Sequence, residues 1–239
     1  MGRLTGKVAI ITGGARGQGA AEAELFRDEG ATVIITDVLD EDGGKTAAQL
    51  DVEFLHHDVS SVDDWETVVA DVIAHHGRID VLVNNAGILR GARLVNTSDE
   101  IWNETVAINQ TGVFLGMRSV APQMISQKSG SIVNLSSVAG LEATFASMAY
   151  GATKWAVRGM TKIAALELGR SNIRVNSIHP GLINTEMTSE FDKEKMVRGI
   201  PLGREAEASE VAALALFLAS EEASYCTGQE FTVDGGMHR

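Results

Sequence analysis

Short runs of β-branched and aliphatic residues alternate with longer segments of helical periodicity along most of the chain. The short runs predict strands at Val8–Thr12, Ala31–Thr36, Val52–His57, Val81–Asn84, Ser131–Leu135, Arg174–Ser177 and Glu230–Val233. Apolar residues recur at three- and four-residue spacing between them, which predicts helices at Gln18–Glu29, Val62–His75, Asp99–Met124, Ala149–Leu168 and Ala208–Ala219. Strands that alternate with helices form parallel sheets through crossover connections. The pattern therefore predicts an α/β fold with a parallel sheet of about seven strands.

No segment of the chain would separate two domains. Its 239 residues fall within the length at which an α/β chain commonly remains a single unit. Prolines occur only at positions 122, 180 and 201, and no low-complexity tract or repeat of fixed period interrupts the pattern. We therefore expect one domain over residues 1–239.

Acidic residues outnumber basic ones by 32 to 20, for a net charge of −12. This charge repels nucleic acid and anionic membrane surfaces, and the sequence contains no Lys/Arg cluster to offset it. No apolar run reaches the roughly 18 residues of a membrane span. The single cysteine, Cys226, excludes an intramolecular disulfide framework and fits a reducing compartment. We expect a cytoplasmic protein that binds neither nucleic acid nor membrane.

The first predicted strand is apolar, as a strand buried on both faces should be, and leads into Gly13-Gly14-Ala15-Arg16-Gly17-Gln18-Gly19. Glycines let the backbone approach a ligand, and the amides that begin the next helix favour a pyrophosphate. The spacing is Gly-x-x-x-Gly-x-Gly, not the general Gly-x-Gly-x-x-Gly, so a plain tight turn is the alternative. Asp37 ends the second strand 18 residues after Gly19, where a carboxylate accepts the ribose hydroxyls of an adenosine. Together these features predict a Rossmann-like, doubly wound sheet with helices on both faces.

Asp37 and Arg16 make opposite predictions about the cofactor. The Asp37 carboxylate repels a 2′-phosphate and favours NAD over NADP. Arg16 could bind a 2′-phosphate in a bidentate manner, contact the pyrophosphate or ribose of NAD, or pair with Asp37. We give Asp37 more weight, because NADP would desolvate its carboxylate beside a dianion, a penalty that one arginine offsets only in part.

Tyr150 and Lys154 lie four residues apart in a predicted helix, and Tyr150 follows Ser137 by thirteen residues. After a dinucleotide-binding unit, this combination predicts an oxidoreductase. Oxidation of a secondary alcohol needs a base beside the hydroxyl while hydride leaves the carbon. A free phenol has a pKa of about 10, so Tyr150 needs the neighbouring charge of Lys154, on the same helix face, to favour its phenolate. Ser137 would donate a hydrogen bond to the substrate oxygen.

Five ordered motifs resemble those of the short-chain dehydrogenase/reductase family, from residue 6 essentially to the end of the chain. They are Thr12-Gly13-x-x-x-Gly17-x-Gly19, Asp58-Val59, Asn84-Asn85-Ala86-Gly87, the set Asn109, Ser137, Tyr150 and Lys154, and His179-Pro180-Gly181 with Ile183 and Thr185. The resemblance implies a catalytic tetrad of Asn109, Ser137, Tyr150 and Lys154, in which Asn109 holds a water that links Lys154 to solvent. Expected cofactor contacts are Gly13, Arg16, Gly17, Gln18, Gly19, Asp37, Val38, Asp58, Val59, Asn85, Ala86, Gly87, Tyr150, Lys154, Pro180, Gly181, Ile183 and Thr185. Without the resemblance, Ser137 would be interpreted as a turn cap and Asn109 as a polar residue within a helix.

The segments that surround the substrate in this family are apolar here. They follow Ser137, the Asn-Asn-Ala-Gly motif and Thr185, where a mobile loop is expected at about residues 185–203. Their apolar residues are Val138, Leu141, Phe145, Met148, Leu89, Leu182, Met187, Phe191 and Met196, of which several could simply be core. An apolar pocket favours a bulky lipophilic secondary alcohol or ketone. Further stretches are similar to bacterial hydroxysteroid dehydrogenases of the family, although cyclic or aryl-aliphatic alcohols would also fill such a cavity.

The histidine pairs His56-His57 and His75-His76 have no carboxylates or thiols at metal-ligand spacing, so we predict no metal. The helices that begin near Asp99 and Ala149 resemble those through which family members form dimers, and the terminal strand resembles their second contact. The resemblance therefore implies a homotetramer.

The leading hypothesis is an NAD-dependent secondary-alcohol dehydrogenase or ketone reductase acting on an apolar substrate. One alternative is an NADP-dependent 3-oxoacyl-type reductase, which Arg16 favours and Asp37 opposes. Another is a non-catalytic dinucleotide sensor with the same fold. Tyr150 with Lys154 argues against a sensor, since mere cofactor binding does not require this pair.

Overall fold

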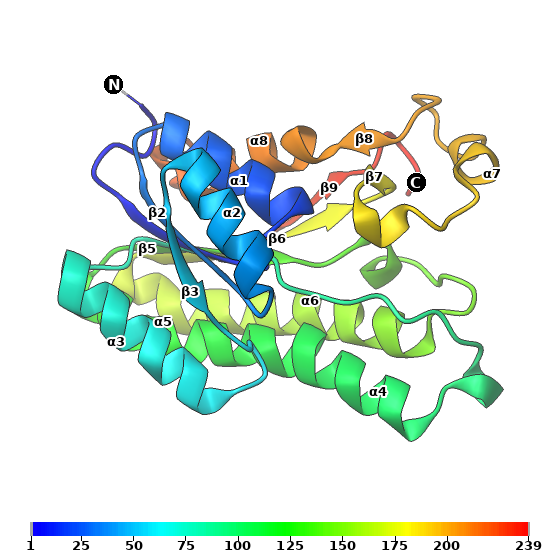
Figure 1. The fold of residues 1–239 in the computed structure, drawn as a ribbon, viewed down its shortest axis with the longest axis horizontal. Coiled ribbons are helices and arrows are strands. Elements are labelled where there is room, and N and C mark those ends of the chain that lie inside the picture. Colours follow the sequence, from blue (N-terminus) through cyan, green and yellow to red (C-terminus); the bar gives the residue numbers. More distant parts are fainter. Residues whose placement is uncertain (1, 239) are drawn as a thin grey trace.

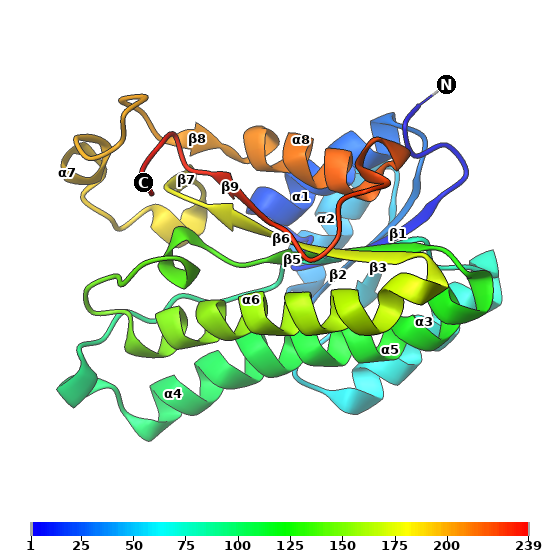
Figure 2. The same cartoon turned by 180° about the vertical axis from the view of Figure 1, so that it is seen from behind.

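Seven parallel strands form one sheet in the order β3-β2-β1-β4-β5-β6-β9. The computed structural model describes residues 2–238. The strands are β1 (Val8–Thr12), β2 (Thr32–Asp37), β3 (Glu53–His56), β4 (Val81–Asn84), β5 (Gly130–Leu135), β6 (Ile173–Pro180) and β9 (Glu230–Val233). Figure 1 and Figure 2 show the sheet between two layers of helices. The predicted doubly wound α/β fold and its seven strands are confirmed.

Helices cover both faces of the sheet. One layer contains α1 (Gly17–Asp28), α2 (Asp40–Leu50) and α8 (Ala208–Ala219), and the other contains α3 (Val62–His76), α4 (Asp99–Val106), α5 (Gly112–Gln127) and α6 (Met148–Leu168) (Figure 1). Alternate residues of β1 enter separate cores. Ala9 and Ile11 belong to one apolar cluster, whereas Val8 and Ile10 belong to the other. Burial on both faces explains why this strand is a continuous apolar run.

The predicted helix Asp99–Met124 is not continuous. It consists of α4 and α5 separated by a π-helical segment, Ala107–Thr111. A π-helical turn holds one more residue than an α-helical turn. Asn109 lies in this turn, and the oxygen and nitrogen of its side-chain amide both bond to the backbone of Ile88. A one-dimensional apolar pattern does not reveal such a local widening.

Helix α2 was not predicted from the sequence. Its pair Gly43-Gly44 lowers helix propensity, and its acidic first turn, although favourable to the helix dipole, adds nothing to the apolar periodicity. Gly43 packs so closely on Phe54 of β3 that an added Cβ would lie 2.1 Å from the ring. The glycine therefore lets α2 pack closely against the Phe54 ring of the sheet.

The segment after Thr185 is anchored at its base by a small second sheet that the sequence did not predict. Here β7 (Ile183–Asn184) pairs in parallel with β8 (Ala206–Glu207), and α7 (Lys193–Val197) lies between them in the chain. The Lys193 ammonium lies 2.8 Å from both Asn184 Oδ1 and Glu205 Oε2. These contacts hold the two ends of the segment together.

The strand order reverses between β1 and β4: successive strands extend the sheet to one side of β1 up to β3, and β4 then pairs in parallel on the other side of β1. Ligands of open parallel sheets bind at such a switch point, outside the carboxyl ends of the strands. Across residues 2–238, no helix combines the length and the apolar character needed to cross a membrane.

Candidate active site

The turns that follow β1 and β4 are locked together at this switch point. The backbone amides of Asn85 and Ala86 each donate to Thr12 Oγ1 at 3.1 Å. The Asn85 side-chain amide donates to the carbonyls of Thr12 and Gly13 at 2.9 and 3.0 Å. Asn85 thus holds the glycine-rich turn in place, and Thr12 shares that task, which the sequence analysis did not assign to it.

The glycine-rich turn fits a dinucleotide pyrophosphate. Gly13 and Gly17 have φ values of 66° and 59°, a left-handed conformation that favours glycine. A Cβ on Gly19 would lie 2.3 Å from the Gly13 carbonyl oxygen. Arg16 precedes α1 without a side-chain bond to its first amides, and the first turn contains no acidic residue. Those amides therefore remain available to an anion.

Asp37 lies beside this turn at the end of β2. Its two carboxylate oxygens accept hydrogen bonds from the amides of Ala15 and Leu39, each at 3.1 Å. The Asp37 carboxylate is therefore held next to the glycine-rich turn. Arg16 does not pair with Asp37, because its guanidinium forms an ion pair with Glu186.

Asp58 and Val59, two of the expected cofactor contacts, follow β3, which pairs with β2 so that Asp37 is opposite His56. Asp58 Oδ1 accepts bonds from the Ser60 amide and hydroxyl at 2.9 and 2.7 Å. Val59 is buried in the core, whereas Val38 is 53% exposed. The predicted residues Asp37, Val38 and Asp58 thus lie along one edge of the sheet, and Val59 contributes mainly to packing.

Helix α6 brings Tyr150 and Lys154 to the turn that follows β5. Lys154 Nζ donates to the Leu135 carbonyl at 2.8 Å and lies 5.5 Å from the centre of the Tyr150 ring. The Ser137 hydroxyl forms a hydrogen bond with Tyr150 and also accepts one from the Ala139 amide at 3.1 Å. Ser137 therefore caps the short 3-10 turn Val138–Gly140, as the simpler interpretation expected, and also faces Tyr150.

Burial disfavours the charged forms of both residues. It raises the pKa of the Tyr150 hydroxyl above 10.0, while the Ser137 hydrogen bond acts in the opposite direction. Burial lowers the pKa of the Lys154 ammonium from 10.5 to about 8. Lys154 is therefore still mainly a cation at pH 7, and its charge is available to a phenolate that would otherwise be unfavourable.

Asn109 and Gly87 complete this cluster. Asn109 Oδ1 accepts from the Ile88 amide, and its Nδ2 donates to the Ile88 carbonyl, both at 2.8 Å. A Cβ on Gly87 would lie 3.3 Å from Asn109 Oδ1 and 3.7 Å from Lys154 Nζ. The structure therefore brings Gly87, Asn109 and Lys154 together, from three separate segments of the chain.

His179 and Ser136 support the cluster, although neither was among the expected catalytic or cofactor-binding residues; His179 was expected only as part of the His179-Pro180-Gly181 motif. His179 Nδ1 lies 3.0 Å from the Ser137 carbonyl, which can only accept, so Nδ1 carries the hydrogen. Nε2 then accepts from the Ser177 hydroxyl at 2.9 Å. Burial lowers the pKa of His179, which favours this neutral form. The Ser136 hydroxyl donates to the Lys154 carbonyl at 2.9 Å and ties α6 to the end of β5.

The remaining predicted residues divide between core and surface. Pro180, Leu182 and Ile183 are buried, and the Gly181 amide donates to the Val233 carbonyl at 2.9 Å. Thr185 packs towards Gly17, since a Cβ there would lie 3.6 Å from the Thr185 methyl group. Among the apolar residues expected around the substrate, Phe145, Met148 and Met187 are exposed, at 78%, 39% and 45%.

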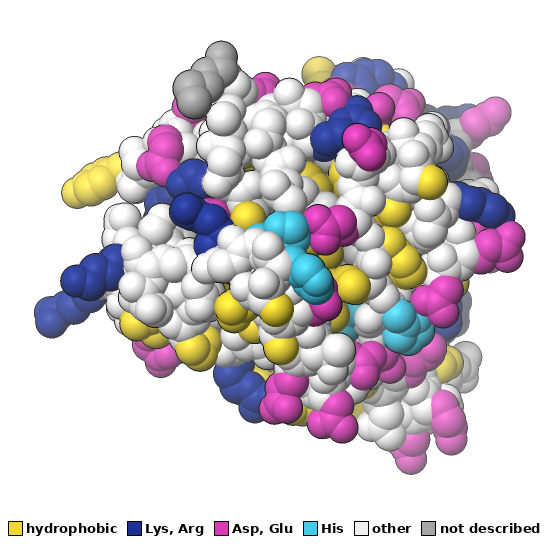
Figure 3. All heavy atoms as spheres, turned by 60° about the vertical axis from the view of Figure 1, so that its left-hand side comes forward, with side chains coloured by type: hydrophobic (Ala, Val, Ile, Leu, Met, Phe, Trp, Pro, Cys, Tyr) yellow, Lys and Arg dark blue, Asp and Glu magenta, His cyan; other side chains and the backbone are white. Residues whose placement is uncertain are grey.

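No group of three or more His, Cys, Asp or Glu side chains within residues 2–238 could hold a metal ion. Figure 3 shows histidines next to acidic side chains on one face of the molecule. His56 pairs with Asp40 at 2.7 Å, and His76 pairs with Glu53 at 3.1 Å. Each of these histidines contacts a single carboxylate at the surface.

Known proteins are similar to this chain over nearly its full length. The chain is 48% identical over 237 residues to a 3-alpha-(or 20-beta)-hydroxysteroid dehydrogenase of Mycobacterium tuberculosis, covering 98% of this chain and 90% of the relative. It is 42% identical to a trans-4-hydroxycyclohexanecarboxylate dehydrogenase of Sinomonas cyclohexanicum, over 98% and 93% of the two chains. It is 45% identical to a 3-oxoacyl-(acyl-carrier-protein) reductase of Thermotoga maritima, over 98% and 99%.

A family model described as enoyl-(acyl carrier protein) reductase matches residues 13–238. This match spans the glycine-rich turn, the Tyr150–Lys154 helix and the terminal strand. The match and the relatives agree with the fold and with the ordered motifs. The chain is therefore an oxidoreductase that belongs to the short-chain dehydrogenase/reductase family, whose members use a nicotinamide dinucleotide.

Proposed function

We propose that the protein is an NAD(H)-dependent oxidoreductase that interconverts a bulky apolar secondary alcohol and its ketone. The observation that supports this most is the cluster of Ser137, Tyr150 and Lys154 beside the glycine-rich turn. Two hydroxyl groups meet there next to a buried ammonium. This arrangement provides a hydrogen-bond donor, a proton acceptor and a compensating charge for one substrate oxygen.

In the proposed reaction, the Ser137 hydroxyl donates a hydrogen bond to the alcohol oxygen, and Tyr150 acts as a phenolate, which Lys154 stabilises because its cation lies close to the ring. The phenolate accepts the proton of the alcohol hydroxyl and becomes the neutral phenol. The bound nicotinamide supplies the acceptor for the hydride. In ketone reduction, Tyr150 returns a proton to the same oxygen. Asn109 is proposed to position water next to Lys154, which connects the site to solvent.

Asp37 supports the choice of NAD. Its carboxylate is held at the glycine-rich turn by two backbone amides, so it cannot easily move away from a 2′-phosphate. The residues proposed to hold the dinucleotide are those predicted from the sequence, from Gly13 to Thr185. Val59 and Ile183 would act mainly through packing, because both are buried.

The proposed substrate class rests on two observations. Apolar side chains, including Phe145, Met148 and Met187, remain exposed on the segments around Ser137 and Thr185. Two of the relatives described above are named for a steroid and for a cyclohexane carboxylate. We infer that a cyclic, lipophilic alcohol fits these surfaces, and that the loop of residues 185–203 is the mobile element that covers it.

A 3-oxoacyl-type reductase is the second candidate, since the relative from Thermotoga maritima bears that name at 45% identity and Arg16 offers a guanidinium for a 2′-phosphate. Initial reaction rates distinguish the proposed alcohol dehydrogenase from the 3-oxoacyl-type reductase. Purified protein is assayed with NAD and NADP on hydroxysteroids and cycloalkanols, and with NADH and NADPH on 3-oxoacyl thioesters. We expect turnover with NAD on the cyclic alcohols. Faster turnover of 3-oxoacyl thioesters with NADPH would replace our proposal with the second candidate.

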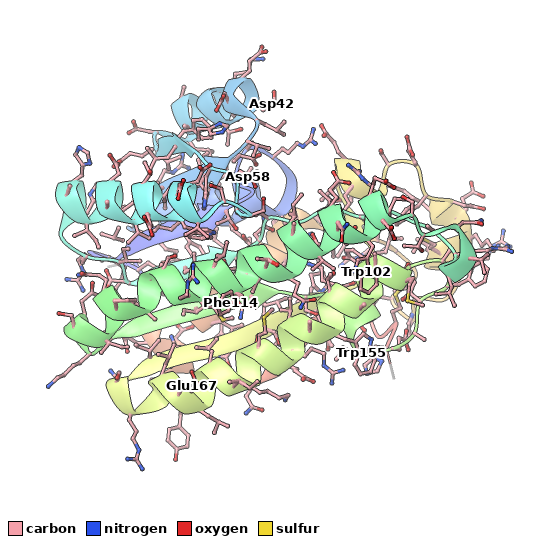
Figure 4. The ribbon with its side chains drawn as sticks, turned by 90° about the horizontal axis from the view of Figure 1, so that it is seen from below. Asp42, Asp58, Trp102, Phe114, Trp155 and Glu167 are labelled. Carbon is pink, nitrogen blue, oxygen red and sulfur yellow. The ribbon has the colours of Figure 1, made fainter. Side chains whose placement is uncertain are left out.

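We also propose that the protein is a cytoplasmic homotetramer. Trp102, Phe114 and Trp155 project from the layer of α4, α5 and α6 (Figure 4), with 40%, 45% and 49% of their surface exposed. Leu166 of α6 is 84% exposed. Apolar side chains gathered on one face are typical of a subunit interface. Light scattering that finds a monomer at micromolar concentration would contradict this assembly.

A further inference from the structure

Arg16 is held by a residue from a distant part of the chain. It immediately precedes α1, next to Ala15, whose amide donates to Asp37. The Arg16 guanidinium pairs with the carboxylate of Glu186, the first residue of the short turn that follows Thr185. The side chains of Arg16 and Glu186 are 54% and 69% exposed, so the pair forms at the surface of the site.

This pairing changes what Arg16 can offer to a cofactor. A guanidinium binds a 2′-phosphate through paired N–H donors, and the same donors bind carboxylates. Glu186 occupies Nη1 of Arg16 and offsets its positive charge, so a 2′-phosphate would have to compete with Glu186 for this guanidinium. A phosphate that displaced Glu186 would leave that carboxylate without its counterion while a further negative group enters nearby. Asp37 and Glu186 therefore both act against a 2′-phosphate, the first directly and the second through Arg16.

We propose that Glu186 is a specificity-determining residue for the cofactor, which keeps Arg16 from a 2′-phosphate and so reinforces selection of the unphosphorylated dinucleotide. This role rests on the proposed preference for NAD. Glu186 touches Arg16 and not Asp37, so its effect on binding depends on Arg16 being present. That dependence distinguishes it from a general contribution of negative charge.

The test measures the dissociation constants of NADH and NADPH by fluorescence titration of the purified protein. The variants are Glu186→Ala, Arg16→Gln and the double variant, with Glu190→Ala as the control. Glu190 is an exposed carboxylate of the same loop, and it forms no ion pair with any of residues 2–238. Both loop positions are exposed, so neither alanine should disturb folding.

In Glu186→Ala we expect NADPH to bind about two- to fivefold more tightly, the range set by an exposed ion pair, with NADH binding within about twofold of wild type. The gain should be absent in the control and should disappear in the Arg16→Gln background. An unchanged NADPH constant, while the wild type still prefers NADH, would overturn the role of Glu186 alone. A gain that persists without Arg16 would also overturn it. Tighter binding of NADPH than NADH by the wild type would overturn both this role and the proposed cofactor.

Discussion

The buried side chain of Glu22 should make the free energy of unfolding of this protein depend on pH. It lies on the inner side of α1 and is fully buried, and within residues 2–238 neither carboxyl oxygen has a hydrogen-bond partner. Burial raises the pKa of this carboxyl from 4.5 to about 8. At pH 7 the folded protein therefore holds Glu22 mainly as a neutral acid, whereas the unfolded chain holds it as a carboxylate.

Because the folded state binds this proton more tightly than the unfolded state, the Glu22 contribution to stability is complete below pH 4.5 and is lost as pH rises to about 8. The shift corresponds to about 5 kcal/mol over the whole range, and to about 2.5 kcal/mol between pH 5 and pH 7. Glu22→Gln has nearly the same shape and no proton to lose. Its free energy of unfolding, relative to wild type, should therefore increase by about 2.5 kcal/mol from pH 5 to pH 7.

Urea denaturation followed by circular dichroism, at pH 5 and pH 7 and at one fixed protein concentration, measures this difference. The difference between variant and wild type cancels the titration of other groups. Glu24→Gln is the matched control, because Glu24 is exposed on the same helix. Parallel pH dependence of the wild type and Glu22→Gln would refute the buried neutral acid.

Three further predictions concern the site and the assembly. Tyr150→Phe should lower kcat by about 10²- to 10⁴-fold while NADH binding, measured by fluorescence, is retained; comparable turnover would exclude Tyr150 as the base. Gly19→Ala should weaken NADH binding by about tenfold or more, because its Cβ would lie 2.3 Å from the Gly13 carbonyl oxygen. Gly44→Ala, where an added Cβ meets nothing within 4 Å, is the control and should bind NADH normally. Leu166→Glu should shift the light-scattering mass towards smaller species, and an unchanged mass would place the interface elsewhere.

Local sequence patterns predicted the strands well because burial on both faces of a parallel sheet demands continuous apolar runs. The bounds of β1, β4 and β9 agree with the prediction to the residue, and β6 extends three residues further, to Pro180. Helix prediction was less complete. It missed α2, whose Gly43 packs closely on Phe54, a contact that only the packed structure reveals.

The candidate site lies at the carboxyl ends of the parallel strands, which meet at one edge of the sheet. Spacing alone predicted that Tyr150 and Lys154 share one helix face. The roles of Ser137 and Asn109 were expected only from the family resemblance, because local spacing allows a turn cap and an ordinary polar residue equally well.

Contacts between distant segments determined the partners and the protonation of individual side chains. The partner of Arg16, which sequence left open among several choices, is Glu186 from 170 positions further along the chain. The support of Ser137 by His179, and the burial of Glu22 without a partner, likewise depend on which surfaces meet in three dimensions. A side chain's charge, tautomer and partner are set by its surroundings, and local sequence does not specify those surroundings until the chain is packed.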